Sequence, residues 1–252
     1  RTSALEAYQE AGEDPKALEC IPMFKRSDIK REAAKIINEE LTVDDSLFLY
    51  HDVCTNGIGY VDLMFKTDSI APEQIPYLGL LKSVLGYVDT ENYTYGELFN
   101  EINANTGGIN CGVEVFDRAD STEEFQAMFS VRGKALYTKM DFLFKMIGEI
   151  LNSSKLEDTK RLYEIVASVK SRAQVNLTGA GHSTAVLRAA AYSSPMAAFQ
   201  DEMAGIGYYQ FIEKLEKDFE QRKEETVEEL CKLMKKILRP ENFMISYTGE
   251  RE

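Results

Sequence analysis

The pattern of apolar and polar residues predicts strands in two parts of the chain. Apolar and polar side chains alternate in "INCGVEVF" (109–116) and "FQAMFSV" (125–131), which is the period of a strand with one buried face. An acidic turn separates them, so they are predicted to form a hairpin. "LFLYH" (47–51) and "IGYVDLMFKT" (58–67) are predicted to pair with each other through an Asn-Gly turn.

Helical spacing of apolar residues dominates the rest of the chain. Leucines form one stripe from Pro72 to Tyr87, a second helix is predicted from Thr94 to Asn103, and the spacing stays helical from Ala135 to Pro240. "NFMISYTG" (242–249) is predicted as a final strand. Hairpins with separately grouped helices predict an α+β fold, in which helices cover one face of an antiparallel sheet.

Residues 1–45 differ from this pattern and are predicted to form a connector. The segment is charged and has few large apolar residues, so it should lie on a surface. Ser27 is predicted to be the N-cap of a helix over 28–40. The folded body is therefore expected to span 46–252, and the start at Arg1 rather than a methionine indicates a piece of a longer polypeptide.

The charge balance narrows the choice of partners. The chain has 42 acidic and 29 basic side chains, a net charge of −13, which argues against nucleic acid as a partner. Solubility in a bacterial-type cytosol explains this charge most simply, and attraction of a basic ligand is the alternative. No apolar run reaches the ~18 residues of a membrane span, so no membrane association is expected. Four scattered cysteines without a C-x-x-C pair indicate free thiols and a cytoplasmic location.

Two stretches around the histidines are candidate sites. His51, Asp52 and Cys54 are close in sequence and could bind a metal, but a second pair of ligands is missing. A polar strand end is the favoured interpretation. His182 follows two glycines in "TGAGHSTAV" (178–186), a pattern like a phosphate-binding loop, but no lysine follows the glycines. A turn between helices, with His182 or Ser183 near the N-cap, is favoured there.

Three other polar features have a structural and a functional interpretation. "VDTENYTYGE" (88–97) is a hydrophilic turn or a loop that contacts a ligand, and Asp62 faces either solvent or a groove. The run of Lys and Glu over 213–229 is a solvated helix face or a surface for a partner. Lys82 lies within the apolar helix, where it could extend its ammonium to water or act as a base of lowered pKa.

Four blocks of the sequence resemble a known family. They are "ALECIPMFKRSDI", "TNGIGYVDLMFKT", "IPYLGLLKSVLGYVDTENYTYGELFNEINANTGGI" and "GAGHSTAVLRAAAYSSPMAAFQDEMAGIGYYQF". Their order and spacing are similar to the presequence-protease branch of the pitrilysin/insulysin zinc peptidases, in the peptidase-associated region that follows the hinge. The resemblance covers nearly all of residues 15–248.

The resemblance implies a position in a larger enzyme. Members of the family have two half-shells joined by a helical hinge, and each half-shell holds two related α+β domains. Residues 1–45 would then be the end of the hinge and 46–252 the third domain. Zinc would be bound in the absent N-terminal domain by an inverted H-x-x-E-H helix, whose Glu is the general base. The implied partners are the N-terminal catalytic half, the fourth domain and unstructured peptides.

The same resemblance predicts that this chain carries no metal or catalytic residue. When "YLGLLKSVL" is aligned with the zinc helix, Leu78 and Lys82 take the two histidine positions and Leu81 takes that of the general base. Leucine has no donor atom for zinc, and a protonated lysine repels the ion. The chain is thus expected to be inactive alone, as a non-catalytic part of a closed peptide-binding chamber. The alternatives are a stand-alone inactive interaction or assembly domain, and an independent enzyme that uses Lys82 or His51.

Overall fold

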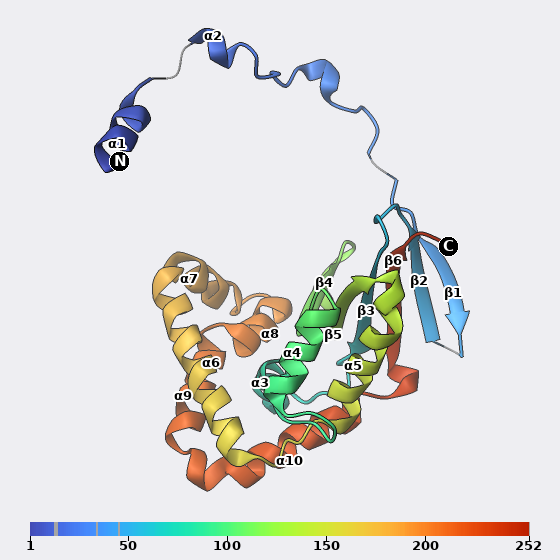
Figure 1. Cartoon of the computed structure of the whole chain (residues 1–252). Helices are drawn as coiled ribbons and strands as arrows, with labels where there is room; N and C mark the ends of the chain where they lie inside the picture. The colour runs from blue at the N-terminus through green and yellow to red at the C-terminus, as the bar shows by residue number, and fades with distance from the viewer. Residues whose placement is uncertain (13–14, 34, 45, 252) are drawn as a thin grey trace. The chain divides into compact units, whose positions relative to one another are not determined.

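The computed structural model describes residues 1–12, 15–33, 35–44 and 46–251, and the chain divides into two compact units (Figure 1). The first unit, Arg1–Ile36, holds the helices α1 (Thr2–Glu10) and α2 (Pro15–Leu18) and the 3₁₀ turn Arg26–Asp28. None of its side chains whose burial is described is buried.

The helix predicted from Ser27 is absent from the described part of 28–40. The chain forms only the 3₁₀ turn there and enters a strand at Glu39. A short helix without a surface to pack against is marginally stable in water, because the hydrogen bonds of a few turns do not offset the free-energy cost of nucleation. The prediction of a helix was therefore wrong, and the reason is the lack of tertiary packing in this segment.

The second unit, Ile37–Glu252, is built on one sheet of six strands in the order β1-β2-β6-β3-β5-β4. The strands are β1 (Glu39–Val43), β2 (Ser46–Asp52), β3 (Ile58–Lys66), β4 (Ile109–Arg118), β5 (Ser121–Leu136) and β6 (Phe243–Gly249). The predicted hairpin of β4 and β5 is confirmed, as is the strand β6. Helices complete the mixed structure, so the predicted α+β fold is confirmed.

The position of β6 corrects two details of the prediction. β6 lies between β2 and β3, so these two strands do not pair with each other as predicted. The β2–β6 pair is parallel, and the sheet is therefore mixed rather than purely antiparallel. Tyr50 of β2 stacks on Tyr247 of β6 with ring centroids 6.1 Å apart, which shows the side-chain packing that accompanies this register.

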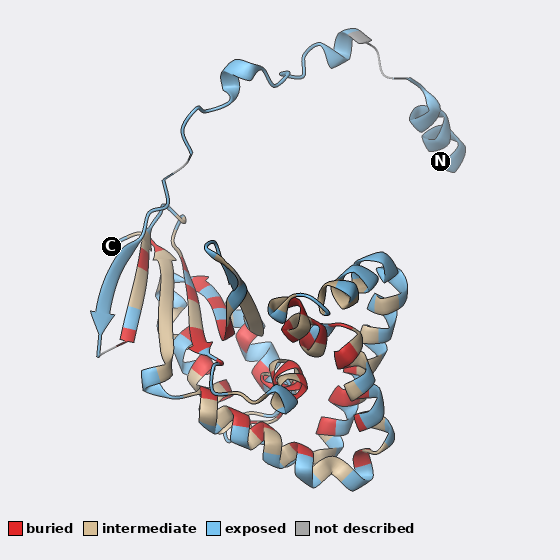
Figure 2. Ribbon diagram, turned by 180° about the vertical axis from the view of Figure 1, so that it is seen from behind, coloured by how far each residue is buried: buried red, intermediate tan, exposed pale blue. Residues whose placement is uncertain are grey.

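β1 belongs to the sheet, although its residues were assigned to the connector. It pairs antiparallel with β2, from Glu39 opposite Tyr50 to Val43 opposite Ser46. All five of its residues are exposed, as Figure 2 shows, so no apolar alternation marked it as a strand. The compact unit begins at Ile37, whereas the assignment of 1–45 to a hinge stays a prediction.

The helical part of the second unit is divided into more helices than the sequence indicated, and α3 is shorter than the helix predicted from Pro72 to Tyr87. They are α3 (Ile75–Val84), α4 (Tyr95–Asn105), α5 (Met140–Ser153), α6 (Thr159–Gly179), α7 (Gly181–Ala190), α8 (Pro195–Ala204), α9 (Ile206–Lys217) and α10 (Phe219–Ile237). In Figure 1, α4 and α5 lie across the sheet, while α6 to α9 form a group beside it. No helix among the described residues combines the length and apolar character of a bilayer span.

α3 is the most buried of these helices and contacts α6, α8, α9, α10 and β4. Leu78, Leu80 and Val84 have no exposed surface. Burial of each such side chain contributes about 2 kcal/mol to folding. Gly79 allows α8 and α9 to come close, since a Cβ there would lie 2.8 Å from the Met203 carbonyl oxygen and 2.8 Å from the Tyr208 ring.

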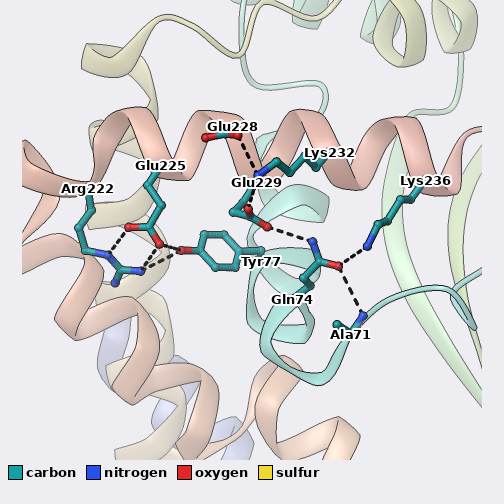
Figure 3. A network of polar contacts seen from close by, with 9 residues as sticks. All are labelled: Ala71, Gln74, Tyr77, Arg222, Glu225, Glu228, Glu229, Lys232 and Lys236. Atoms are coloured by element: carbon teal, nitrogen blue, oxygen red, sulfur yellow. Dashed lines mark hydrogen bonds and ion pairs between the residues drawn. The ribbon is translucent and has the colours of Figure 1, made fainter.

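Polar contacts attach the first turn of α3 and the 3₁₀ turn before it, Pro72–Gln74, to α10 (Figure 3). The Tyr77 hydroxyl accepts a hydrogen bond from Arg222 at 2.9 Å and donates one to Glu225 at 3.4 Å. The Gln74 amide donates to Glu229 at 3.0 Å. The predicted solvated face over 213–229 is thus partly occupied by contacts within the chain.

The C-terminal end of β6 is attached to the loop between β2 and β3. The Glu250 carboxylate accepts hydrogen bonds from the main-chain N–H groups of Thr55, Asn56 and Gly57 at 3.1 to 3.4 Å, and from the Tyr137 hydroxyl at 2.9 Å. Contacts with the Cys54 thiol, with Tyr137 and with these N–H groups lower the pKa of Glu250 to about 2.

Replacing Gly79 by Ala is expected to destabilise the protein by about 2 kcal/mol, because the main-chain oxygen of Met203 cannot rotate away from the new methyl group. Urea unfolding followed by circular dichroism measures this loss. Gly148→Ala in α5 is the matched control, since its Cβ would meet nothing closer than 4.0 Å. The control should be neutral or gain up to ~1 kcal/mol from helix propensity. Equal effects of the two substitutions would contradict the close-packing argument.

The contribution of Glu250 to stability is expected to depend on pH. Because its folded-state pKa is about 2 and lies below the ordinary value of 4.5, the contribution is complete above the unfolded value and is lost as the pH falls toward 2. The difference in unfolding free energy between wild type and Glu250→Gln should therefore shrink between about pH 5 and about pH 2. Glu123→Gln, at an exposed carboxylate, should have little effect throughout. A constant difference for Glu250→Gln would show that the carboxylate is not held in this way.

Candidate functional site

The three positions matched to the zinc motif occupy two different environments. Leu78 and Leu81 are 0% and 1% exposed and form part of the main core. Lys82 follows on the next position of α3 and is half-buried. α3 therefore places its leucine side chains in the core and the ammonium of Lys82 at the edge of the core. The equivalence of these positions to a zinc motif stays a prediction.

Lys82 lines a cleft of about 450 Å³ that is open to solvent. The end of α3 with the turn that follows it (82–87), the residues Phe99, Ile102 and Asn103 of α4, and residues 108–114, which are almost all in β4, form most of its lining. Arg172 of α6 lines it as well. These elements come from distant parts of the sequence and meet because α3 packs against both β4 and α6.

The Lys82 ammonium has no hydrogen bond or ion pair to any residue that the structure describes. Burial lowers its pKa, and the negative charge of Glu114 acts in the opposite direction. Glu114 is already engaged, because its carboxylate forms an ion pair with Arg132 at 3.1 Å. Lys82 is therefore a half-buried cation without a committed counter-ion.

Asp62 points to the face of the sheet opposite its neighbour Val61, which belongs to the main core. Its Oδ2 atom accepts a hydrogen bond from Arg132 at 2.7 Å, while its Oδ1 atom is buried without a partner in the described structure. Arg132 thus links Asp62 with Glu114 across β3, β5 and β4. The odd polar residue of β3 is explained as part of this charge chain.

Cys111 adds no charge to the cleft. Burial raises the pKa of its thiol to about 12, so the thiol is neutral near pH 7. Ile102 and Val113, together with Cys111, give the cleft an apolar wall. Phe99 is 56% exposed at its rim. The lining thus combines apolar surface with the two cations Lys82 and Arg172 and the already paired Glu114.

His51 contacts the segment before β1 and the strand β6. Its Nδ1 donates to the Ile37 carbonyl oxygen at 2.8 Å, and its Nε2 lies at hydrogen-bonding distance, 3.1 Å, from Ser246 Oγ. Asp52 and Cys54 are exposed nearby. Among the residues that the structure describes there is no group of three or more His, Cys, Asp and Glu side chains suited to a metal ion.

The remaining predicted candidates form ordinary turns. α6 ends at Gly179 and α7 begins at Gly181, so the favoured helix–helix turn is confirmed. Its N-cap is Ala180, and His182 and Ser183 follow in the first turn of α7. In the turn over 88–97, Thr94 and Glu97 form a capping box. Asn92 donates to Glu149 of α5 at 3.0 Å. This turn is therefore fixed to the core by its own polar groups.

The sequence analysis did not predict two features of this cleft, Arg172 and the open edge of β4. Arg172 is one of several basic residues on α6, and no local pattern distinguishes it. β4 was predicted as a strand, but whether a strand lies at the edge of a sheet depends on the order of strands, which the alternation of residues does not contain.

Comparison with known proteins identifies the family. The model of the family described as the associated region of the M16 peptidases, subfamily C, matches residues 1–215. The chain is 35% identical to "Protein HypA" of Clostridium perfringens, over 98% of this chain and 25% of the relative. It is 26% identical to "Presequence protease 1, chloroplastic/mitochondrial" of Arabidopsis thaliana, over 99% of this chain and 23% of the relative. It is 29% identical to "Presequence protease, mitochondrial" of Yarrowia lipolytica, over 83% of this chain and 21% of the relative.

The chain spans about a quarter of the length of these curated relatives. The predicted resemblance to the peptidase-associated region is confirmed by the family match, which covers the connector and most of the body of the fold. The chain belongs to the family of associated regions of the M16 peptidases, subfamily C.

Proposed function

We propose that this chain is a non-catalytic domain of a zinc metalloendopeptidase that degrades short, unstructured peptides. In this proposal the domain forms part of the wall of a closed chamber, which folded proteins are too large to enter. Its partners are the N-terminal catalytic half and a fourth domain of the same polypeptide, and zinc belongs to that N-terminal half. The proposed location is the cytosol of a bacterium.

The proposal rests on the side chains of the central helix α3. The positions that the proposed alignment sets against the zinc motif hold two core leucines, Leu78 and Leu81, and Lys82, none of which is a ligand for zinc at neutral pH. The family match and the relatives named as presequence proteases support a role beside a peptidase. Since the chain spans only a quarter of those relatives, the remaining length offers room for a catalytic half.

Complementation with the N-terminal half of the same polypeptide tests the proposal. The chain alone is expected to bind no stoichiometric zinc and to leave a fluorogenic peptide intact, whereas the mixture of both parts should cleave it. A chelator should abolish the cleavage, because zinc activates the attacking water. Cleavage should persist when His51→Ala and His182→Ala are combined in this chain, since neither histidine takes part. Chelator-sensitive cleavage by the chain alone would refute the proposal.

A further inference from the structure

β4 presents an open edge of the sheet to the cleft. Its one neighbour is β5, so every second main-chain N–H and C=O group of the strand points away from the sheet. Between Ile109 and Val115, no hydrogen bond from another described element reaches these groups. Such an edge can accept a further strand through main-chain hydrogen bonds.

The cleft beside this edge is locally cationic, although the chain carries a net charge of −13. Lys82 and Arg172 come from two helices, and neither has an ion pair in the described structure. The one acidic side chain in the lining, Glu114, is paired with Arg132. Arg172 also lines a neighbouring groove, where the Glu164 carboxylate is paired with Arg161 at 2.9 Å. A ligand group that complements the charge of this cleft is therefore negative, such as a carboxylate.

The apolar part of the lining suits an extended segment. In a strand, side chains two residues apart point to the same side. A carboxylate directed at Lys82 therefore places its second neighbours toward the apolar wall around Ile102 and Val113 or the rim at Phe99. Phe99 and Tyr87, 56% and 50% exposed, are available for such contacts.

From these observations we infer that the cleft binds an extended peptide segment, which adds a strand to the edge of β4 and places a carboxylate against Lys82 and Arg172. The segment has an acidic residue with an apolar residue two positions away. The other edge of the sheet, β1, does not fit this ligand, because it carries Glu39 and Glu40 and borders no such cleft. The inference rests on the proposed function in one respect, namely that peptides are the ligands.

A synthetic peptide serves as the probe. It is short, acetylated, amidated and labelled with fluorescein, with one central glutamate, valine two residues to either side and threonine elsewhere. Its binding to the 252-residue chain is followed by fluorescence anisotropy. The glutamate peptide is expected to bind about tenfold more tightly than its glutamine counterpart, the difference expected for one charge-assisted hydrogen bond. A glutamine peptide with a free C-terminal carboxylate distinguishes recognition of a chain terminus from that of a side chain.

Substitutions of Lys82 and Arg172 test whether the glutamate of the bound peptide contacts these two side chains. Lys82→Met should lower the affinity for the glutamate peptide about tenfold and leave that for the glutamine peptide unchanged. Arg172→Gln should act in the same direction. Lys160→Met, at an exposed lysine of α6 outside the cleft, is the matched control and should have no effect. Lys82→Met should unfold at the same or a higher temperature, because it removes a half-buried charge, so weaker binding would not reflect unfolding.

Alternate N-methylation tests strand addition. Methyl groups on one alternate set of amides in the peptide should abolish binding, whereas those on the other set should leave it intact, because successive N–H groups point in opposite directions. Equal effects of both sets, equal affinity of the glutamate and glutamine peptides, or unchanged discrimination in Lys82→Met would each overturn the inference. Failure here would not affect the cleavage by the two mixed parts, so the two proposals fail separately.

Discussion

The structure depends most on the burial of α3. This helix contributes side chains without exposed surface to the core, and it contacts four other helices and β4. Its close approach to α8 and α9 requires Gly79, because the main chain of Met203 and the ring of Tyr208 occupy the space of a side chain. The helices beside the sheet are thus held to it by α3 together with the direct contacts of α8 with β4 and β5. The first turn of α3 is further attached to α10 by the contacts of Tyr77.

The same burial explains the chemistry available at this part of the fold. A helix that serves as the centre of a core can direct few polar groups inward without a cost of several kcal/mol each. Lys82 lies near the end of α3, where the core gives way to a cleft, and its amino group has no ion pair among the described residues, while burial lowers its pKa. The domain therefore retains a hollow beside its central helix while carrying leucines at the adjacent turn.

Elements with a strong local pattern were predictable. The hairpin of β4 and β5, the strand β6, the capping box at Thr94 and the apolar helix α3 each follow from residues close in sequence. The break between α9 and α10 at Asp218 was missed, because the apolar stripe continues across it. The helix expected over 28–40 failed for the opposite reason, since a suitable local pattern found no surface to pack on.

The sequence alone determined the fold class, the family and the absence of a histidine pair on α3, because these depend on periodicity and residue type. The tertiary structure decided which strands are neighbours: it placed β6 between β2 and β3 and left β4 at an edge. It also brought Arg172, from α6, to the cleft of Lys82. These features could not be predicted, because alternation records which side of an element is buried but contains no information on what lies against it.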